Sequence, residues 1–433
     1  MSVVRLLSVA PDPLRIARAL ADRPGLALLA SRPQGAPGPE DARWSFVACE
    51  PVEASDELVP PGREEEGPAF GPRWIGVVPY EALRELERPV WTRDPDDRPA
   101  CALARPAWRR YAAVVRVDHA TGEVAVEADD ARAAAALGRA VERGGGEGEP
   151  PGRRGAKSGF AVSVLPDDEP EQAHLERVRA ALRLIAAGDL YEINLARRIP
   201  LAVRGDALAL FASLLEAAPA PWGFLQDLGE STVCGASPEL ALSVRGERLR
   251  TCPIKGTRPR GNDAVADARL ARELDGDAKE RAELTMAVDV HRSDLGRVAV
   301  AGSVRVLGEP RLLAGRTVWS RVAEVVARRR PGVGVEEVVR AVLPCGSITG
   351  APKVRAMEVI ARLEPWRRGA YTGALGYVGR GGRVELAMAI RTIEIAAGRG
   401  VYFSGGGIVA DSVPERELDE TRWKAAQLAR LGS

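Results

Sequence analysis

The stretch VYFSGGGIVADSVPERELDETRWK (residues 401–424) contains both kinds of regular structure that occur along this chain. Its first residues predict a strand over 400–404, which the three glycines Gly405 to Gly407 follow. Pro414 is typical of the first turn of a helix, and Ser412 and Glu415 have the spacing of a capping box. A strand and a capped helix therefore adjoin here, and the fold class depends on how such elements are ordered elsewhere.

The rest of the chain mixes strands and helices without a regular alternation. Apolar residues at Leu175, Val178, Leu182 and Ile185 have helical spacing. The sequence predicts helices over 170–188 and 263–291, and strands over 191–199, 231–235, 240–251, 299–306, 373–379 and 384–395. Because there is no βαβ order and no internal repeat, we expect an α+β fold with large sheets rather than a Rossmann fold or a barrel.

One segment has the composition of a linker. Residues 131–159 begin as an Ala-rich helix and then become rich in Gly, Pro and charged residues. This change predicts an N-terminal subdomain over 1–150 and a second domain over 160–433.

Composition excludes several classes of function. The net charge of +1 gives no overall field that would attract nucleic acid or a membrane surface. The five cysteines include no CxxC pair, which indicates a reducing compartment and no zinc site. Three histidines disfavour a metal-binding histidine cluster or a Ser-His pair. We find no apolar run long enough to span a bilayer and no signal-cleavage pattern, so we expect a cytoplasmic protein.

Lysine is rare in this sequence, and one lysine lies in the motif TCPIKGTRPRG (residues 251–261). The 61 basic residues include only five lysines, of which Lys255 is one. Arginine carries the same charge but cannot release its proton near neutral pH, whereas a neutral lysine amine is a nucleophile. Lys255 is therefore either an ordinary solvated side chain or a reactive amine.

Two features are candidates for binding an anion. Gly405, Gly406 and Gly407 either form a tight turn or present backbone N–H groups to an anion. Arg391 lies in the apolar segment RVELAMAIRTIEI, where an unpaired charge is costly. It must pair with a structural carboxylate or with an anionic ligand.

Acidic residues on two predicted helices are candidates for binding a cation. Glu280 and Glu283 are three residues apart, and Glu420 and Lys424 are four apart. The second pair is either a surface ion pair or part of a site for Mg²⁺, which often takes one or two protein carboxylates and leaves water and substrate to complete its shell.

Taken in order, these motifs resemble the chorismate-utilising enzymes, the group that contains anthranilate synthase component I, isochorismate synthase and aminodeoxychorismate synthase component I. The resemblance covers about 160–430 and rests on the following stretches: GDLYEINLARR (188–198), GASPEL (235–240), PIKGTRPRG (253–261), KERAELTMAVDVHRSDLGRVAVAGSV (279–304), PCGSITGAPKVRAMEVIARLEP (344–365), YTGALGY (371–377), AIRT (389–392) and FSGGGIVADSVPERELDETRWK (403–424). It implies the anthranilate synthase component I fold, in which large antiparallel sheets form a sandwich with helices packed outside.

The resemblance also implies roles for individual residues. Glu239 matches the general acid that protonates a departing hydroxyl, and Thr257 matches a residue next to the substrate ring. Glu283 and Glu420 match ligands of Mg²⁺, which holds one carboxylate of chorismate. The groups that match receivers of the substrate carboxylates are Tyr371, Arg391, Lys424 and the amides of Gly405, Gly406 and Gly407.

Lys255 distinguishes the branches of this family. The matching motif usually reads PIAGTRPRG in anthranilate synthases and PIKGT in aminodeoxychorismate synthases. In the second branch the lysine is proposed to attack ring carbon 2 of chorismate as the 4-hydroxyl leaves, after which ammonia adds at carbon 4 and expels the lysine. We expect burial to lower the pKa of this lysine. Isochorismate-type members carry a lysine base where this chain has Glu192, so hydroxylation at carbon 2 is disfavoured.

The resemblance therefore implies an aminodeoxychorismate synthase component I for p-aminobenzoate and folate synthesis. Ammonia is expected from a separate glutamine amidotransferase subunit. The alternatives are anthranilate synthase component I and a catalytically weak, amino-acid-binding regulatory subunit. The last alternative rests on Leu28-Leu29-Ala30-Ser31 and Arg43-Trp44-Ser45-Phe46, which keep part of the pattern of a tryptophan site. One departure is Ser320, which stands where relatives usually have histidine and cannot carry charge.

Overall fold

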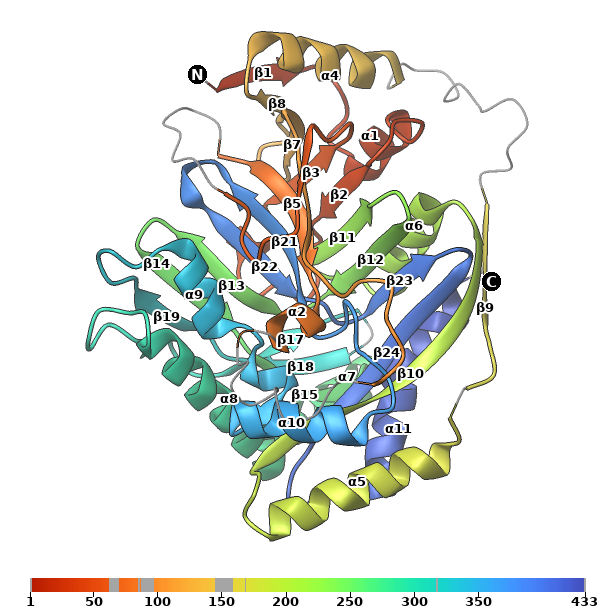
Figure 1. Cartoon of the computed structure of the whole chain (residues 1–433), viewed down its shortest axis with the longest axis vertical. Helices are drawn as coiled ribbons and strands as arrows, with labels where there is room; N and C mark the ends of the chain where they lie inside the picture. The colour runs from red at the N-terminus through yellow and green to blue at the C-terminus, as the bar shows by residue number, and fades with distance from the viewer. Residues whose placement is uncertain are drawn as a thin grey trace.

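The computed structural model describes residues 2–61, 70–84, 86, 97–144, 159–167, 169–316 and 318–431. Every strand pairing between its named strands is antiparallel. In this part of the chain the strands form two large sheets and one small sheet, shown in Figure 1.

The largest sheet has twelve strands within the described residues. Eleven of them follow one path, in the order β1 (Val3–Leu7), β8 (Val124–Ala128), β7 (Ala113–Asp118), β3 (Trp44–Ala48), β2 (Ala27–Ala30), β11 (Trp222–Asp227), β12 (Ser231–Ser237), β23 (Thr392–Ala396), β24 (Arg399–Ile408), β10 (Glu192–Gly205) and β20 (Gly350–Ala351). The remaining strand, β9 (Phe160–Val164), pairs with β10.

The second sheet has nine strands in the same described part of the chain. Their order is β16 (Arg305–Val306), β19 (Val325–Arg328), β14 (Arg248–Cys252), β13 (Leu240–Arg245), β22 (Val384–Met388), β21 (Ala374–Gly379), β5 (Pro72–Val78), β6 (Ala107–Arg110) and β4 (Glu53–Ser55). A small sheet is formed by β15 (Ile254–Pro259), β18 (Val318–Val322) and β17 (Arg311–Ala314).

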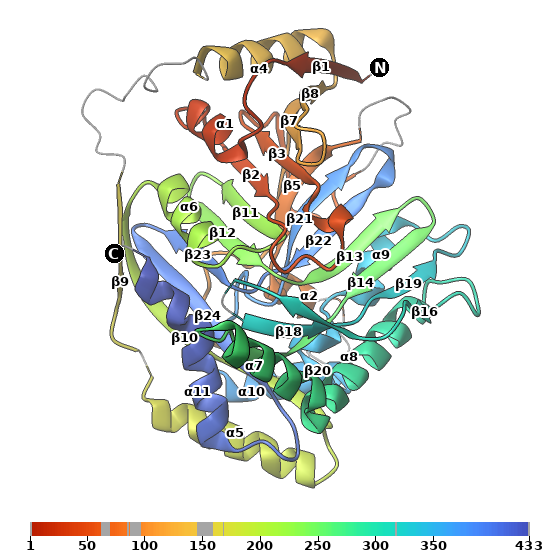
Figure 2. The same ribbon diagram turned by 180° about the vertical axis from the view of Figure 1, so that it is seen from behind.

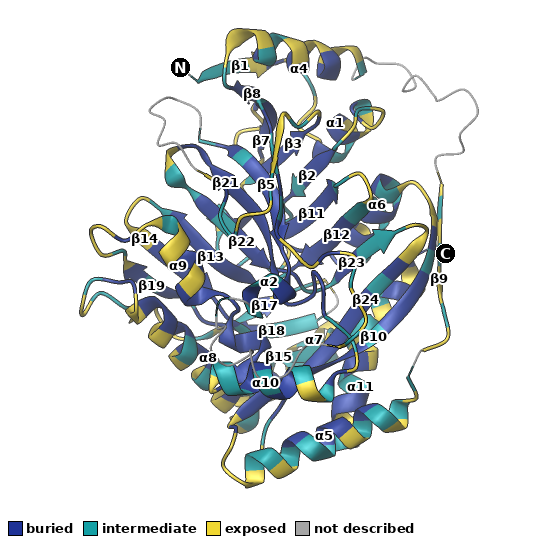
Figure 3. Cartoon of the chain, in the orientation of Figure 1, coloured by how far each residue is buried: buried dark blue, intermediate teal, exposed yellow. Residues whose placement is uncertain are grey.

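The two large sheets pack face to face, and helices cover their outer faces. One apolar core lies between the sheets and joins Phe46, Phe224 and Val233 of the first to Val77 and Leu375 of the second. A second core lies under α1 (Pro13–Ala19), α4 (Ala131–Gly144) and α6 (Ala207–Ala217), and a third lies under α8 (Ala278–Gly296) and α9 (Val335–Val342). Figure 3 shows the buried strands inside and the exposed outer faces of α4, α5 (Glu171–Ala186) and α8. The prediction of a sandwich of large antiparallel sheets with helices outside is confirmed.

Segments on either side of residues 131–159 contribute strands to both large sheets. In the first sheet β2 pairs with β11, and in the second β5 pairs with β21. The start of the linker segment is helical, as expected, in α4, while residues 145–158 lie outside the described residues. Strands from the two parts of the chain are therefore neighbours in both sheets. The division into 1–150 and 160–433 stays a prediction from the sequence.

Several predicted elements are interrupted in the structure. The expected helix over 263–291 is two helices, α7 (Ala264–Gly276) and α8, because the Asp277 carboxylate accepts the N–H groups of Lys279 and Glu280 and caps a new helix. The expected strand over 240–251 is the β13–β14 hairpin. The expected strand over 299–306 shrinks to β16.

The quoted C-terminal stretch also differs from its prediction. The three glycines lie inside β24 rather than after it, so the tight-turn interpretation is wrong. The capping box is absent as well, because α11 (Pro414–Ala425) has Val413 at its N-cap, and the Ser412 hydroxyl accepts the N–H of Val409 instead. No helix in the described part of the chain is long and apolar enough to cross a membrane.

Candidate active site

A cavity lies where the small sheet approaches α8, β24 and α11. Figure 2 shows the ribbons of these elements from behind. Most of the site residues predicted from the sequence line it: Glu239, Lys255, Thr257, Glu283, Tyr371, Arg391, Gly405, Gly407, Glu420 and Lys424. Ser320, the position of the missing histidine, lines it too and is paired with Thr257 in the β15–β18 register. Gly406 is the one predicted site residue that is not part of the lining.

Lys255 on β15 is buried and donates a short hydrogen bond to Glu192 on β10. Burial alone would lower the pKa of Lys255, but the carboxylates of Glu192, Glu283 and Glu239 outweigh it, so that this pKa is raised. The expectation of a lowered pKa is therefore wrong for the free protein. Lys255 is held as an ammonium and needs a proton acceptor before its nitrogen can act as a nucleophile.

Glu239 has the environment of an acid that is protonated near neutral pH. It lies between β12 and β13, is buried, and accepts a hydrogen bond of 2.7 Å from the Ser347 hydroxyl. Burial raises the pKa of Glu239 to about 7, because the carboxylate form loses its hydration. Such a carboxyl group can donate a proton to a leaving group at physiological pH.

Arg391 is the clearest candidate for an anion receptor. It sits at φ 53° in the break between β22 and β23, so the strand predicted over 384–395 is interrupted at this residue. Within the described part of the chain, its side chain forms no hydrogen bond or ion pair, and burial lowers its pKa. A guanidinium that lines a cavity and is not paired with a protein carboxylate is suited to binding an anionic ligand.

The glycines of β24 add backbone donors to the same wall. Gly405, Gly406 and Gly407 pair with β10 on one edge, while the pairing of β24 with β23 stops at Tyr402. The other edge of β24 therefore has no strand partner at the glycines among the described residues. Since N–H groups in a strand alternate between its edges, part of this run can donate to a ligand.

Two helices bring carboxylates to the same cavity. Glu283 of α8 and Glu420 of α11 both line it, together with Glu280. Burial raises the pKa of Glu283 to about 7, while at Glu420 the Lys424 ammonium, 2.6 Å away, outweighs burial and lowers the pKa. The Glu420–Lys424 ion pair thus exists, but it faces the cavity rather than open surface.

These carboxylates fit a divalent cation only in part. The described residues contain no group of three or more Asp, Glu, His or Cys side chains arranged to hold a metal. Mg²⁺ needs only one or two protein carboxylates when water and substrate supply the rest. A buried carboxylate with a raised pKa, as at Glu283, is also one whose charge a cation would stabilise.

A buried ion pair that the sequence did not predict supports the cavity wall. The Arg368 guanidinium is inaccessible to solvent and binds both oxygens of Glu364. It also donates to the carbonyl of Asn194 at 2.8 Å and to that of Ile348 at 3.3 Å, and both of these residues line the cavity. In the sequence, only the spacing of four residues between Glu364 and Arg368 indicates this pair. That spacing is common among ion pairs on helix surfaces, so it does not predict a buried one.

The segments that keep part of a tryptophan-site pattern line a second cavity, between the two large sheets. Its lining includes Ala30, Ser31, Trp44, Phe46 and Trp222.

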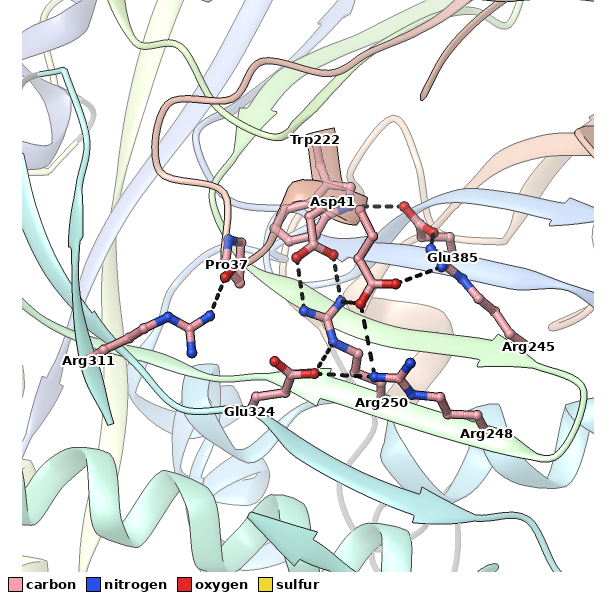
Figure 4. Close-up of polar contacts among 10 residues, drawn as sticks. Pro37, Asp41, Trp222, Arg245, Arg248, Arg250, Arg311, Glu324 and Glu385 are labelled. Carbon is pink, nitrogen blue, oxygen red and sulfur yellow. Dashed lines mark hydrogen bonds and ion pairs between the residues drawn. The ribbon is translucent and has the colours of Figure 1, made fainter. Parts of the chain in front are cut away.

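A network of ion pairs, drawn in Figure 4, borders this second cavity. Arg250 binds both oxygens of Asp41, at 2.5 and 2.9 Å, and Arg245 binds Glu385, which also accepts the indole N–H of Trp222 at 3.2 Å. Arg250 is on β14, which precedes β15 and Lys255 in the chain.

Comparison with known proteins identifies the family. The family model for chorismate binding enzymes matches residues 28–430, and the chain therefore belongs to this family.

Among relatives, the chain is 38% identical over 390 residues to anthranilate synthase component 1 of Thermus thermophilus, covering 88% of this chain and 82% of that protein. It is 36% identical over 373 residues to aminodeoxychorismate synthase of Streptomyces griseus, covering 84% and 50%. The structure of anthranilate synthase component I from Streptococcus pneumoniae superposes with a TM-score of 0.77 at 27% identity, covering 89% and 92%.

Proposed function

We propose that this chorismate-binding enzyme is component I of an aminodeoxychorismate synthase, which converts chorismate and ammonia to 4-amino-4-deoxychorismate. The observation that carries the proposal is the position of Lys255. It lines the same cavity as the acid Glu239 and the anion receptor Arg391, so a nucleophile, an acid and a receptor face one space. Lys255 is buried and lines this cavity, where its amine could reach a bound ligand once its proton is removed.

Binding of the substrate follows from the charges of the cavity. The Arg391 guanidinium, the Tyr371 hydroxyl, the Lys424 ammonium and the amides of Gly405 and Gly407 receive the two carboxylates of chorismate. Gly406 is not given this role, because it does not line the cavity. Thr257, two residues after Lys255 on β15, lies beside the ring. These contacts fix ring carbon 2 toward Lys255 and the 4-hydroxyl toward Glu239, and such fixed geometry removes much of the entropic part of the barrier.

Glu283 and Glu420 would hold a Mg²⁺ ion between α8 and α11. When bound, the ion supplies positive charge that holds a substrate carboxylate and lowers the cost of burying these glutamates. Lys279 and Lys424, which pair with Glu283 at 3.5 Å and with Glu420 at 2.6 Å, keep the two carboxylates partly neutralised in the metal-free protein.

The chemistry uses Lys255 and Glu239 in turn. The neutral Lys255 amine attacks carbon 2, both ring double bonds shift, and the 4-hydroxyl leaves as water with the proton of Glu239. Ammonia then adds at carbon 4 and expels the lysine, and the Glu239 carboxylate takes up the extra proton of the new amine. Atoms and charge balance, because each proton that is given is recovered within one cycle.

Ammonia is proposed to come from a separate glutamine amidotransferase subunit, in a cytoplasmic enzyme of p-aminobenzoate and folate synthesis. The "component 1" in the names of several relatives supports a partner of this kind. In vitro, ammonium should replace it.

The second candidate function is that of anthranilate synthase component I, and the names of most of the relatives found favour it. In that reaction ammonia attacks carbon 2 directly, and Lys255 would occupy the space that ammonia needs. A third candidate is a regulatory subunit that binds an amino acid such as tryptophan in the second cavity. Calorimetric titration of the protein with L-tryptophan tests it, and binding without any turnover of chorismate would support it.

One assay separates the first two candidates. The purified chain is incubated with chorismate, Mg²⁺ and ammonium, and the products are separated by chromatography. We expect 4-amino-4-deoxychorismate, and anthranilate as the sole product would overturn the proposed function.

A further inference from the structure

Glu192 and Lys255 form a buried pair of opposite charges between two different sheets. Glu192 begins β10 and is 2% exposed, while Lys255 is 8% exposed. Glu192 Oε1 accepts the hydrogen bond from Lys255 Nζ. Lys255 lines the cavity, whereas Glu192 is not part of its lining.

The pair fits beside β24 because residue 407 is a glycine and has no side chain. A Cβ atom at Gly407 would lie 2.5 Å from Glu192 Oε1 and 3.3 Å from Lys255 Nζ. The absence of a side chain on β24 thus allows the carboxylate and the ammonium to meet beside the cavity wall. Any larger residue would displace the acceptor from the lysine.

We propose that Glu192 is a catalytic residue, the base that takes the proton from Lys255 and so creates the nucleophilic amine. This role rests on the proposed function, in which the Lys255 nitrogen bonds to the substrate ring. One Nζ–H proton passes to Glu192 Oε1, and a rotation of one staggered step about Cε–Nζ turns the lone pair into the cavity. When ammonia later expels Lys255 as a neutral amine, the Glu192 carboxyl returns the same proton.

Other charged groups also face Lys255, but they are less suited to this task. Glu283 and Glu420, on α8 and α11, act on its charge from the proposed cation site, and Glu239 is needed as the acid. The buried His291 of α8 feels the charge of Lys255, and burial, the main cause, holds its pKa at about 3. Among these groups Glu192 is the one whose hydrogen bond with Lys255 the structure shows.

The test is the ratio of the Glu192→Gln rate to the wild-type rate for 4-amino-4-deoxychorismate formation, measured from pH 6.5 to 8.5. Taking the ratio cancels the ionisation of Glu239, which both proteins share. We expect a loss of about 100-fold at pH 6.5, since general bases contribute on this scale. The loss should shrink by up to about tenfold per pH unit, because Lys255 must then release its proton to solvent and the neutral fraction rises with pH.

Two controls make the result specific. Glu127 of β8 is another fully buried carboxylate, which pairs with Arg116 at 2.7 Å and does not line the cavity. The ratio of the Glu127→Gln rate to the wild-type rate should therefore stay near one at every pH. Glu192→Asp keeps a carboxylate and should give a ratio that does not change with pH. A wild type that makes only anthranilate overturns the proposed function and this role together. A Glu192→Gln ratio near one, or one independent of pH, in an enzyme that makes 4-amino-4-deoxychorismate overturns only the role of Glu192.

Discussion

Lys255 on β15 and Glu192 on β10, 63 positions apart in the chain, form a buried hydrogen-bonded ion pair beside the candidate active site. The pair holds the lysine as an ammonium until its proton is taken.

Arg391→Ala should raise KM for chorismate by roughly 10- to 150-fold, which corresponds to a charge-assisted hydrogen bond worth about 1.5–3 kcal/mol. Steady-state kinetics measures the effect. Arg422→Ala is the matched control, because Arg422 is exposed on α11 and pairs with Glu171. If Arg391→Ala lowers only the thermal stability and leaves KM unchanged, then Arg391 has a structural role.

Glu283→Gln and Glu420→Gln should each raise the Mg²⁺ concentration needed for half-maximal activity by more than about tenfold, since a site with few anionic ligands loses one. Titration of activity with Mg²⁺ measures this. Glu415→Gln, on the same helix as Glu420 but paired with Arg179 at the surface, should leave the titration unchanged. Full activity in excess chelator would rule out the metal site.

Activity should fall as pH rises through about 7, because burial raises the pKa of Glu239 and the reaction needs its protonated form. The Ser347 hydroxyl donates to the carboxylate and so favours the ionised form. Ser347→Ala should therefore move this alkaline limb upward by about one pH unit. Ser45→Ala, at a buried serine of β3, is the control. A limb that stays in place or moves downward in Ser347→Ala would contradict the assignment of Glu239 as the acid.

Arg368→Lys should lower kcat/KM by about 10- to 100-fold, because Asn194 and Ile348 would shift and misplace the substrate. Arg380→Lys is the matched control, since Arg380 is equally buried but binds Asp129 and the carbonyl of Pro72, away from the cavity. Both variants should lose stability in thermal unfolding. Equal losses of kcat/KM in the two variants would show that Arg368 acts only through overall stability.

Much of the fold and of the site could be predicted from the sequence, but some local features could not. Helical periodicity predicted α5 within about two residues, since local apolar spacing decides which face is buried. The break at Arg391 was not predictable, because a positive φ at a residue other than glycine depends on tertiary contacts.

The pairing of distant residues was the largest gap. The sequence showed only that residue 192 is a glutamate and not a lysine. Its contact with Lys255 could not be predicted, because it depends on how β10 and β15 meet in space. Gly405 to Gly407 resembled a turn, and only the pairing with β10 shows that they form a strand. The support of the cavity by Arg368 likewise requires the carbonyls of Asn194 and Ile348 to converge.

Lys255→Arg should abolish formation of 4-amino-4-deoxychorismate, because a guanidinium keeps its proton at neutral pH and has no free lone pair. Lys255→Ala should also lose this product while it still binds chorismate, and it recreates the alanine of the PIAGTRPRG motif. Amination at carbon 2 by ammonia, with an anthranilate-type product, is then expected. An active Lys255→Arg enzyme would contradict the covalent mechanism.

The most direct test of Lys255 as the covalent nucleophile is mass spectrometry of the wild-type protein after incubation with chorismate and Mg²⁺ without ammonia. We expect the peptide that contains Lys255 to gain the mass of chorismate less one water, and the same peptide of Lys255→Arg to stay unmodified. An unmodified Lys255 peptide in a wild-type enzyme that makes 4-amino-4-deoxychorismate when ammonia is added would contradict the account.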